Sequence, residues 1–116
     1  MPLDYVCFSR YFKVVDWSSP KWTRWTTKVK QGEDFNITAQ DWNDFIDFIK
    51  SVYTRNGWTQ PTMAYVSANQ DFLAARFNEV KNAIGSKLST GITDRVAGQD
   101  ILASYFHTME DRINKL

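Results

Sequence analysis

Apolar residues recur at steps of three and four in three separate stretches of this chain, and the three stretches share one pattern. The copies are NITAQDWNDFIDFI at 36–49, DFLAARFNEVKNAI at 71–84 and DILASYFHTMEDRI at 100–113. Steps of three and four place the apolar side chains on one face of a helix. The pattern therefore predicts three amphipathic helices, over about residues 37–54, 72–85 and 101–115.

Residues that favour helix ends flank each copy. The first residue of each copy suits an N-cap, because its side-chain oxygen can accept a hydrogen bond from a free helix N–H. These three residues are Asn36, Asp71 and Asp100. Thr38, with Asp41 three residues later, is a rival cap in the first copy. Gly57, after Asn56, and Gly85 suit a left-handed residue at a helix end.

A short polar lead-in with a tight turn precedes each helix, so the full repeat is an extended piece, a turn and a helix. The lead-ins begin at Val29, Val66 and Val96. Because the copies start 35 and then 29 residues apart, a regular solenoid is disfavoured, and three helices around one core are expected. The shared apolar positions predict which side chains meet in that core: Trp42, Phe77 and Phe106 in one position, and Ile49, Ile84 and Ile113 in another.

The first 30 residues have a different pattern. Tyr5–Trp17 is rich in aromatic residues and valine, Pro20 follows two serines, and residues 21–29 alternate bulky and polar side chains. This segment is predicted to be an extended arm or a β-hairpin that packs on the helices or on a neighbouring subunit. The expected organisation is an aromatic and basic arm at 1–30 and a three-repeat helical domain at 31–116, which together form one compact unit.

Composition narrows the class of protein. A chain of 116 residues is long enough for one modest core. The single cysteine, Cys7, has no partner for an internal disulfide, and no Cys/His cluster suggests a structural metal. The sequence contains neither a membrane-spanning apolar run nor a recognisable signal peptide, so it is interpreted as soluble and not secreted by the usual signal.

The small net charge of +1 conceals an uneven distribution. Residues 10–30 contain six basic side chains and one acidic side chain, whereas residues 31–116 contain eight basic and eleven acidic ones. The front of the chain is therefore basic and the remainder acidic. This difference could attract an acidic partner, or join the front of one copy to the back of another.

No group of residues predicts a catalytic or metal site. Asp41, Asp44 and Asp47 fall on the polar side of the first predicted helix, where a solvated face is expected. His107, the only histidine, takes the position that Asn43 and Asn78 hold in the other copies, which favours a side chain that hydrogen-bonds a neighbouring backbone. Cys7 is expected to be packed and inert. The sequence thus predicts no enzyme activity, no cofactor and no metal.

Aromatic residues alternate with basic ones in the front segment and are the candidates for an interaction surface. They are Tyr11, Phe12, Trp17, Trp22 and Trp25. They are interpreted first as protein-contact or core anchors, because Trp, Tyr and Arg are enriched at protein interfaces. The alternatives are a nucleic-acid-binding module, in which the rings stack on bases, and a glycan-binding module.

The repeat unit resembles short repeats of bacteriophage tail-associated structural proteins. The residues that carry the resemblance are VKQGEDFNITAQDWN at 29–43 and VAGQDILASYFH at 96–107. The resemblance implies a virion or prophage component in a tail, fibre or baseplate, located in the virion or the bacterial cytoplasm. Such a protein would act by self-association or by docking on a larger structural protein, without enzymatic activity.

Overall fold

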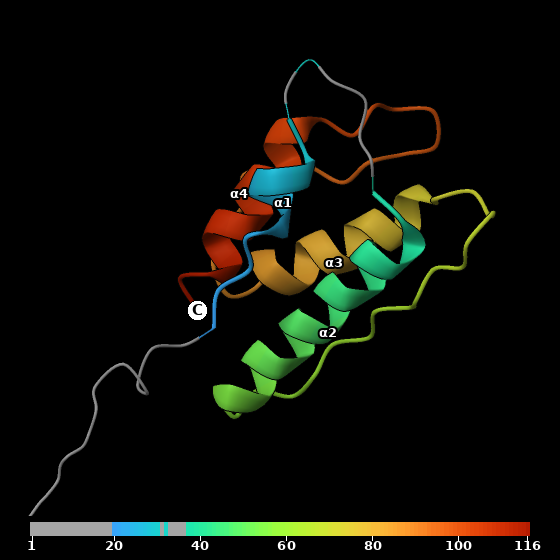
Figure 1. Cartoon of the computed structure of the whole chain (residues 1–116). Coiled ribbons are helices and arrows are strands. Elements are labelled where there is room, and N and C mark those ends of the chain that lie inside the picture. The colour runs from blue at the N-terminus through green and yellow to red at the C-terminus, as the bar shows by residue number, and fades with distance from the viewer. Residues whose placement is uncertain (1–19, 31, 33–36) are drawn as a thin grey trace, which may run out of the picture.

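Four helices and their connecting loops make up the described part of the chain in the computed structural model (Figure 1). The structure describes residues 20–30, residue 32 and residues 37–116. The helices are α1 (Arg24–Lys28), α2 (Ala39–Arg55), α3 (Ala74–Gly85) and α4 (Ala103–Ile113), and these residues contain no strand. The predicted mainly helical fold is confirmed. Within the described residues, no helix has the length and apolar character needed to cross a membrane.

The three repeat helices all start from the same side of the molecule. In Figure 1 the loops that lead into α2, α3 and α4 lie at the top and right, whereas the blue segment that leads into α1 and the C terminus lie at the left. We call residues 37–39, 66–73 and 96–102 the head, and residues 20–22 with 113–116 the foot.

Each repeat helix begins at an alanine, two residues later than predicted. Before α2, Thr38 accepts a hydrogen bond from the Asp41 amide while the Asp41 carboxylate accepts one from the Thr38 amide. This reciprocal pair is a capping box. Leu73 and Leu102 hold the same place before α3 and α4, in extended conformation and without a side-chain cap.

The prediction that Asp71 and Asp100 cap their helices is therefore wrong, because helical geometry starts only after the extended leucines that follow them. Asn36, the third predicted cap, lies outside the described residues. At the other helix ends, Gly57 has the expected left-handed conformation, with φ of 73°. Gly85 instead belongs to the last turn of α3.

The tight turn predicted before each helix is present in the second and third repeats, whereas in the first repeat only Gly32 of the turn lies within the described residues. In each repeat one residue of the lead-in has a positive φ: 82° at Gly32, 66° at Asn69 and 88° at Gly98. Glycine and asparagine are the residues that adopt this conformation at least cost. Asn69 and Gly98 each stand two residues before the start of their copy, so the second and third repeats place the positive φ at the same position.

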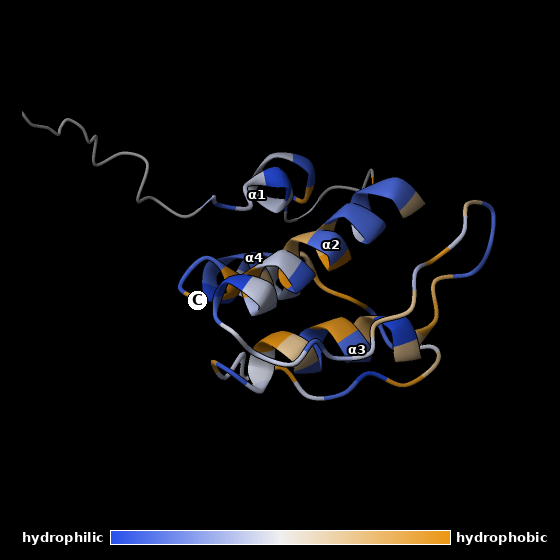
Figure 2. Cartoon of the chain, turned by 90° about the horizontal axis from the view of Figure 1, so that it is seen from below, coloured by the Kyte–Doolittle hydropathy of each residue, from blue (hydrophilic) through white to orange (hydrophobic). Residues whose placement is uncertain are grey.

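One aromatic ring from each repeat meets the other two at the centre of the core. The ring centroids of Trp42, Phe77 and Phe106 lie 6.0–6.3 Å from one another, nearly an equilateral triangle. Figure 2 shows the hydrophobic faces of α2 and α3 turned toward the space between them. The six shared positions all lie in one buried core: Trp42, Phe77, Phe106, Ile49, Ile84 and Ile113.

The repeats are also joined by a side chain that reaches from each helix to the start of another repeat's lead-in or to the residue directly before it. Asn43 of α2 donates to the Val66 carbonyl and accepts from the Val66 amide, at 2.9 and 2.8 Å. Asn78 of α3 holds the Arg95 amide and carbonyl in the same way, both at 2.8 Å. His107 of α4 bonds through Nε2 to the carbonyl of Val29. The first repeat thus holds the second, the second holds the third, and the third holds the first.

The closing contact explains why a histidine stands where the other repeats have asparagine. The Val29 amide already donates to the Trp25 carbonyl, so only the Val29 carbonyl remains for the side chain of the third repeat. One side-chain donor is then enough, so an asparagine amide, which can both donate and accept, has no advantage over histidine here. The ring of three repeats is closed at this seam between α4 and the segment 20–30.

The segment at 20–30 differs from the strand that its alternating pattern predicted. Residues 24–28 form the short helix α1, so the extended form is wrong for this part, and residues 1–19 lie outside the described residues. No side chain of α1 caps its own start. Instead, the buried carboxylate of Glu110 in α4 accepts hydrogen bonds from the Trp25 and Thr26 amides. A contact across 85 residues of sequence thus supplies the cap.

Candidate interaction surface

An apolar groove opens at the head, directly over the central aromatic rings. Its volume is about 450 Å³, and its lining includes Trp42 and Phe106 of the core together with Phe72 and Ile101 from the starts of the second and third repeats. The turn at 66–70 and residues 37–39 complete the lining. Phe72 stands edge-on to Trp42, with ring centroids 4.8 Å apart. The groove therefore has an aromatic floor and one exposed aromatic wall.

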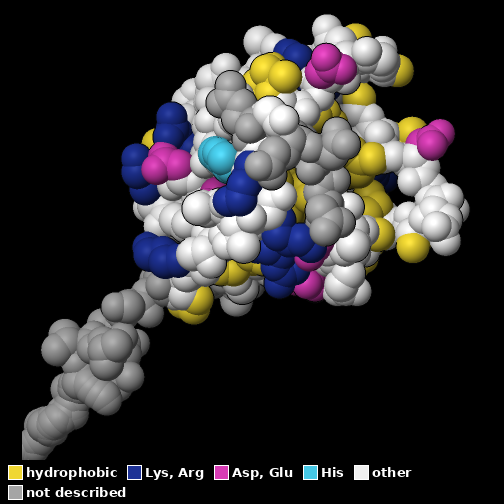
Figure 3. All heavy atoms as spheres, turned by 45° about the horizontal axis from the view of Figure 1, so that its top comes forward, with side chains coloured by type: hydrophobic (Ala, Val, Ile, Leu, Met, Phe, Trp, Pro, Cys, Tyr) yellow, Lys and Arg dark blue, Asp and Glu magenta, His cyan; other side chains and the backbone are white. Residues whose placement is uncertain are grey.

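Exposed apolar side chains gather around this groove. Phe72 is 40% exposed, and Leu73 and Leu102, which directly follow groove residues, are 56% and 49% exposed. Of the five large exposed hydrophobic side chains of the described residues, all but Tyr65 lie in the head: Phe72, Leu73, Val96 and Leu102. Figure 3 shows hydrophobic side chains collected along one side of this face, apart from the basic group at its centre. Exposed apolar groups concentrated in this way mark association sites.

The aromatic residues predicted to form an interface are placed differently. Trp25 is fully buried and Trp22 is 7% exposed, and both pack against Phe45 of α2, at 5.1 and 5.0 Å between ring centroids. Their rings therefore belong to the core of their own chain and cannot stack on an external base or sugar. The other candidates, Tyr11, Phe12 and Trp17, lie outside the described residues.

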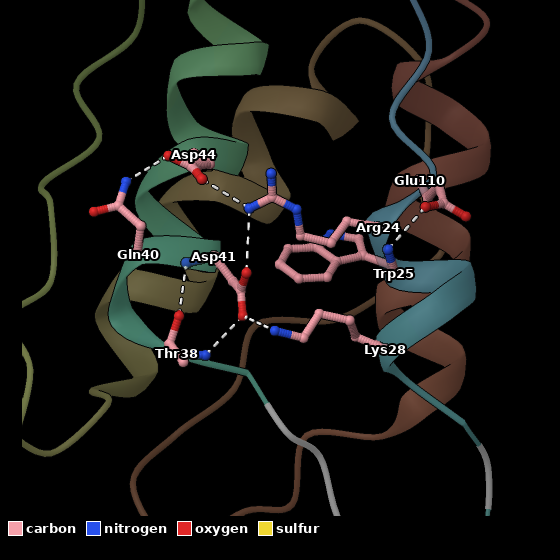
Figure 4. Close-up of polar contacts among 8 residues, drawn as sticks. All are labelled: Arg24, Trp25, Lys28, Thr38, Gln40, Asp41, Asp44 and Glu110. Carbon is pink, nitrogen blue, oxygen red and sulfur yellow. Dashed lines mark hydrogen bonds and ion pairs between the residues drawn. The ribbon is translucent and has the colours of Figure 1, made fainter.

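The basic residues of α1 are paired with acidic residues of α2 (Figure 4). Arg24 contacts Asp44 at 2.7 Å and Asp41 at 3.2 Å, and Lys28 contacts Asp41 at 2.5 Å. Asp41 is 7% exposed, so the solvated face predicted for this part of α2 is wrong at this position. The uneven charge along the sequence is thus partly neutralised inside one chain, where the basic front meets the acidic back.

The pKa values of these groups follow from the pairing. Burial acts to raise the pKa of Asp41, but hydrogen bonds from Lys28 and Thr38 outweigh burial, so the pKa lies below the ordinary value of 3.8. The hydrogen bond from Arg24 lowers the pKa of Asp44, and the same bond raises the pKa of Arg24 against the effect of burial. Asp41, Asp44 and Arg24 are therefore charged at neutral pH.

Of the remaining residues considered for chemistry, Cys7 lies outside the described residues, and His107 and Asp47 have structural partners. His107 closes the ring of repeats at the Val29 carbonyl, as a backbone-binding side chain in this position was predicted to do. Asp47 accepts a hydrogen bond from the Tyr65 hydroxyl at 2.5 Å. In the part of the chain that the structure describes, no three His, Cys, Asp or Glu side chains come close enough together to hold a metal ion.

No protein-family model, curated protein or solved structure matches this chain. The residues at the head are therefore interpreted from their geometry and chemistry alone.

The head surface was not recognised from the sequence, although one signal pointed to it. In the repeat position held by Thr38, the second and third copies carry Leu73 and Leu102. Leucine cannot cap a helix and gains nothing from exposure, so its use twice at a cap position indicates a role outside the helix. The depth of the groove beside them depends on how the three repeats pack, and no local pattern encodes it.

Proposed function

We propose that this protein is a non-enzymatic assembly protein that docks other protein surfaces, including copies of itself, through its head. The observation that carries the proposal is the concentration of exposed Phe72, Leu73 and Leu102 around an apolar groove. Interfaces are typically built around such an apolar centre with a polar rim. The setting of the proposal, a phage tail, fibre or baseplate, comes from the likeness of the repeat unit to phage tail repeats.

The non-enzymatic part of the proposal is supported by the way in which titratable side chains are used. Glu110 caps α1, Asp41 and Asp44 hold α1 on α2, and His107 fastens the third repeat to the first. Each of these groups binds the backbone or an ion partner of its own chain. None of them lines the apolar groove at the head.

Nucleic-acid binding is the second candidate, and the described residues give it less support. Trp22 and Trp25 are buried, so they cannot stack on bases. Arg24 and Lys28 are held by aspartates, so their charges are already partly neutralised. Lys21 and Lys30 of the same segment are exposed and each donates to a backbone carbonyl, but two cations supply little phosphate binding.

The two candidates differ in salt dependence. The mass of the intact chain in solution is measured by light scattering over a range of protein concentrations at about 50 and 200 mM salt, with and without single-stranded DNA. An assembly protein with an apolar interface forms a complex whose mass changes little with salt. A chain that remains a monomer and binds DNA, with affinity that falls steeply between the two salt concentrations, would refute the assembly function and favour the nucleic-acid one.

A further inference from the structure

Two acidic side chains of the head have no partner in their own chain. Among the described residues, the other acidic side chains each form a hydrogen bond or an ion pair with a neighbour. Asp71 and Asp100 form neither and are exposed. Each directly precedes an apolar pair of the head, residues 72–73 or 101–102. The head contains no lysine or arginine, so its exposed apolar groups have an acidic rim.

This combination of groups selects the kind of surface that the head can bind. An apolar patch with an acidic rim is complemented by apolar side chains that lie beside basic ones. A second head does not meet this requirement, because the aspartates of the two copies would approach each other and like charges weaken an interface. The partner surface must therefore be basic.

Such a surface lies where α2 and α3 end. Arg55, in the last turn of α2, is exposed, and its side chain has no hydrogen bond, ion pair or ring contact within the described part of the chain. Lys87, which follows α3, is exposed and lies over the ring of Trp58 at 4.6 Å. The Asn56 side chain donates to the Leu116 carbonyl at 3.3 Å, so Leu116 adjoins the end of α2. We call this surface the basic end: Arg55, Trp58, Lys87 and Leu116.

The head and the basic end of one molecule cannot meet. α2 begins beside the head and ends at Arg55, and its 17 residues span about 25 Å. Asp71 is held beside the start of α2, because the next residue, Phe72, packs on Trp42 with ring centroids 4.8 Å apart. In Figure 1 the loops before α3 and α4 lie at the top and right, whereas α2 ends at the bottom. Because both surfaces are fixed to the same helix, only another copy can bring a basic end to the head.

From this geometry we propose that the head of one copy docks on the basic end of a second copy. The two unpaired aspartates of the head then face Arg55 and Lys87, and its exposed leucines cover the partly exposed ring of Trp58. The contact joins two different surfaces, so it produces a ring if the rotation closes and a filament if it does not. The inference rests on the proposed assembly function and names its partner, which is another copy of this chain.

Charge reversal on either surface tests the contact. The head variant carries Asp71→Lys and Asp100→Lys, and the end variant carries Arg55→Glu and Lys87→Glu. In each full-length variant, like charges face each other across the contact, which weakens it. We expect each variant to raise the dissociation constant of self-association about tenfold or more, measured by light scattering over a range of protein concentrations at about 150 mM salt.

Two controls separate the contact from a general effect of charge. Lys30→Glu with Lys50→Glu changes the net charge as much as the end variant does, at positions outside the head and the basic end, and should associate like the parent. Arg55→Gln with Lys87→Gln removes the two charges without repulsion, so it should weaken association less than the end variant does. Circular dichroism checks that each variant stays folded, and the glutamine variant serves in place of the end variant if the glutamates disturb the fold.

Mixing the two defective chains gives the decisive measurement. The head variant has two basic surfaces and the end variant has two acidic ones, so opposite charges face each other only between unlike chains. An equimolar mixture should therefore associate with about the affinity of the parent. At about 150 mM salt, exposed charges more than about 8 Å apart are largely screened, so attraction between the net charges of the two chains does not account for this recovery.

Each contrary result overturns the inference. A parent chain that is monomeric at high concentration, an end variant that associates like the parent, a control variant weakened as much as the end variant, or a mixture that does not recover would each do so. Leu73→Ala with Leu102→Ala keeps these results separate from the proposed function. If this variant loses self-association while the end variant keeps it, the head still docks, on another surface. Only a monomeric parent with salt-dependent DNA binding would remove both proposals.

Discussion

Removing the side chains that join one repeat to the next should destabilise the protein in proportion to the hydrogen bonds lost. The perturbations are Asn43→Ala, Asn78→Ala and His107→Ala. Each asparagine makes two hydrogen bonds to one backbone residue, Val66 or Arg95, at 2.8–2.9 Å, whereas His107 makes one, from an exposed position. At a net 0.5–1.5 kcal/mol per bond, each asparagine variant should lose about 1–3 kcal/mol of unfolding free energy and the histidine variant about 0.5–1.5 kcal/mol.

The assay is urea unfolding followed by tryptophan fluorescence, because buried Trp25 and Trp42 report on the core. Alanine favours helix more than asparagine does, which offsets part of the loss. Ser104→Ala, at an exposed position of α4, controls for this gain and should change the free energy by less than about 0.5 kcal/mol. The domain's total is about 5–15 kcal/mol, so the predicted losses are measurable.

The order of the three variants carries the test. If the repeats are held together as described, both asparagine variants unfold at clearly lower urea concentration than the histidine variant. Asparagine variants with the same unfolding free energy as Ser104→Ala would refute the reasoning. Water would then hydrogen-bond the backbone groups of Val66 and Arg95 as well as the asparagine side chains do.

Three further outcomes are expected. Phe77→Ala or Phe106→Ala should each lower the unfolding free energy by about 3–5 kcal/mol through the cavity left in the core, whereas Tyr65→Ala, at an exposed position, should cost far less; unchanged thermal midpoints would contradict the central triangle. Glu110→Ala should lower the unfolding free energy by about 1.5–3 kcal/mol, measured by urea unfolding, because the Trp25 and Thr26 amides at the start of α1 lose a charged acceptor. Because the folded pKa of Asp41 is lowered, the stability contributed by its carboxylate is complete above the ordinary value of 3.8 and disappears as pH falls through the folded value. The urea midpoint should therefore fall less between about pH 6 and pH 3 in Asp41→Asn than in the parent. An equal fall in both proteins would count against this account.

The sequence alone determined the three repeat helices and the side chains at their centre. Spacing by three and four fixes which residues share a helical face, and that relation is local to each copy. The same comparison of copies predicted that the side chain at the position of Asn43, Asn78 and His107 hydrogen-bonds a backbone. It could not show which backbone, because the partners lie 17–78 residues away along the chain.

The tertiary structure alone decided the helix α1. Five residues are too few to form a helix in isolation, so their alternating pattern indicated a strand. They become helical because Glu110 caps their start and Asp41 and Asp44 hold their basic face. Those three acids lie on other helices, and no window of local sequence contains both sides of these contacts.

The burial of Trp22 and Trp25 and the exposure of Leu73 and Leu102 also depend on packing. Hydrophobicity is a property of each residue, but the side chains that are covered depend on which surfaces the closed ring of repeats brings together. In this fold Trp22 and Trp25 are buried where the third repeat meets the segment 20–30, whereas Leu73 and Leu102 remain exposed at the head. The candidate interaction surface therefore belongs to the assembled fold, whereas the helices that carry it are encoded locally.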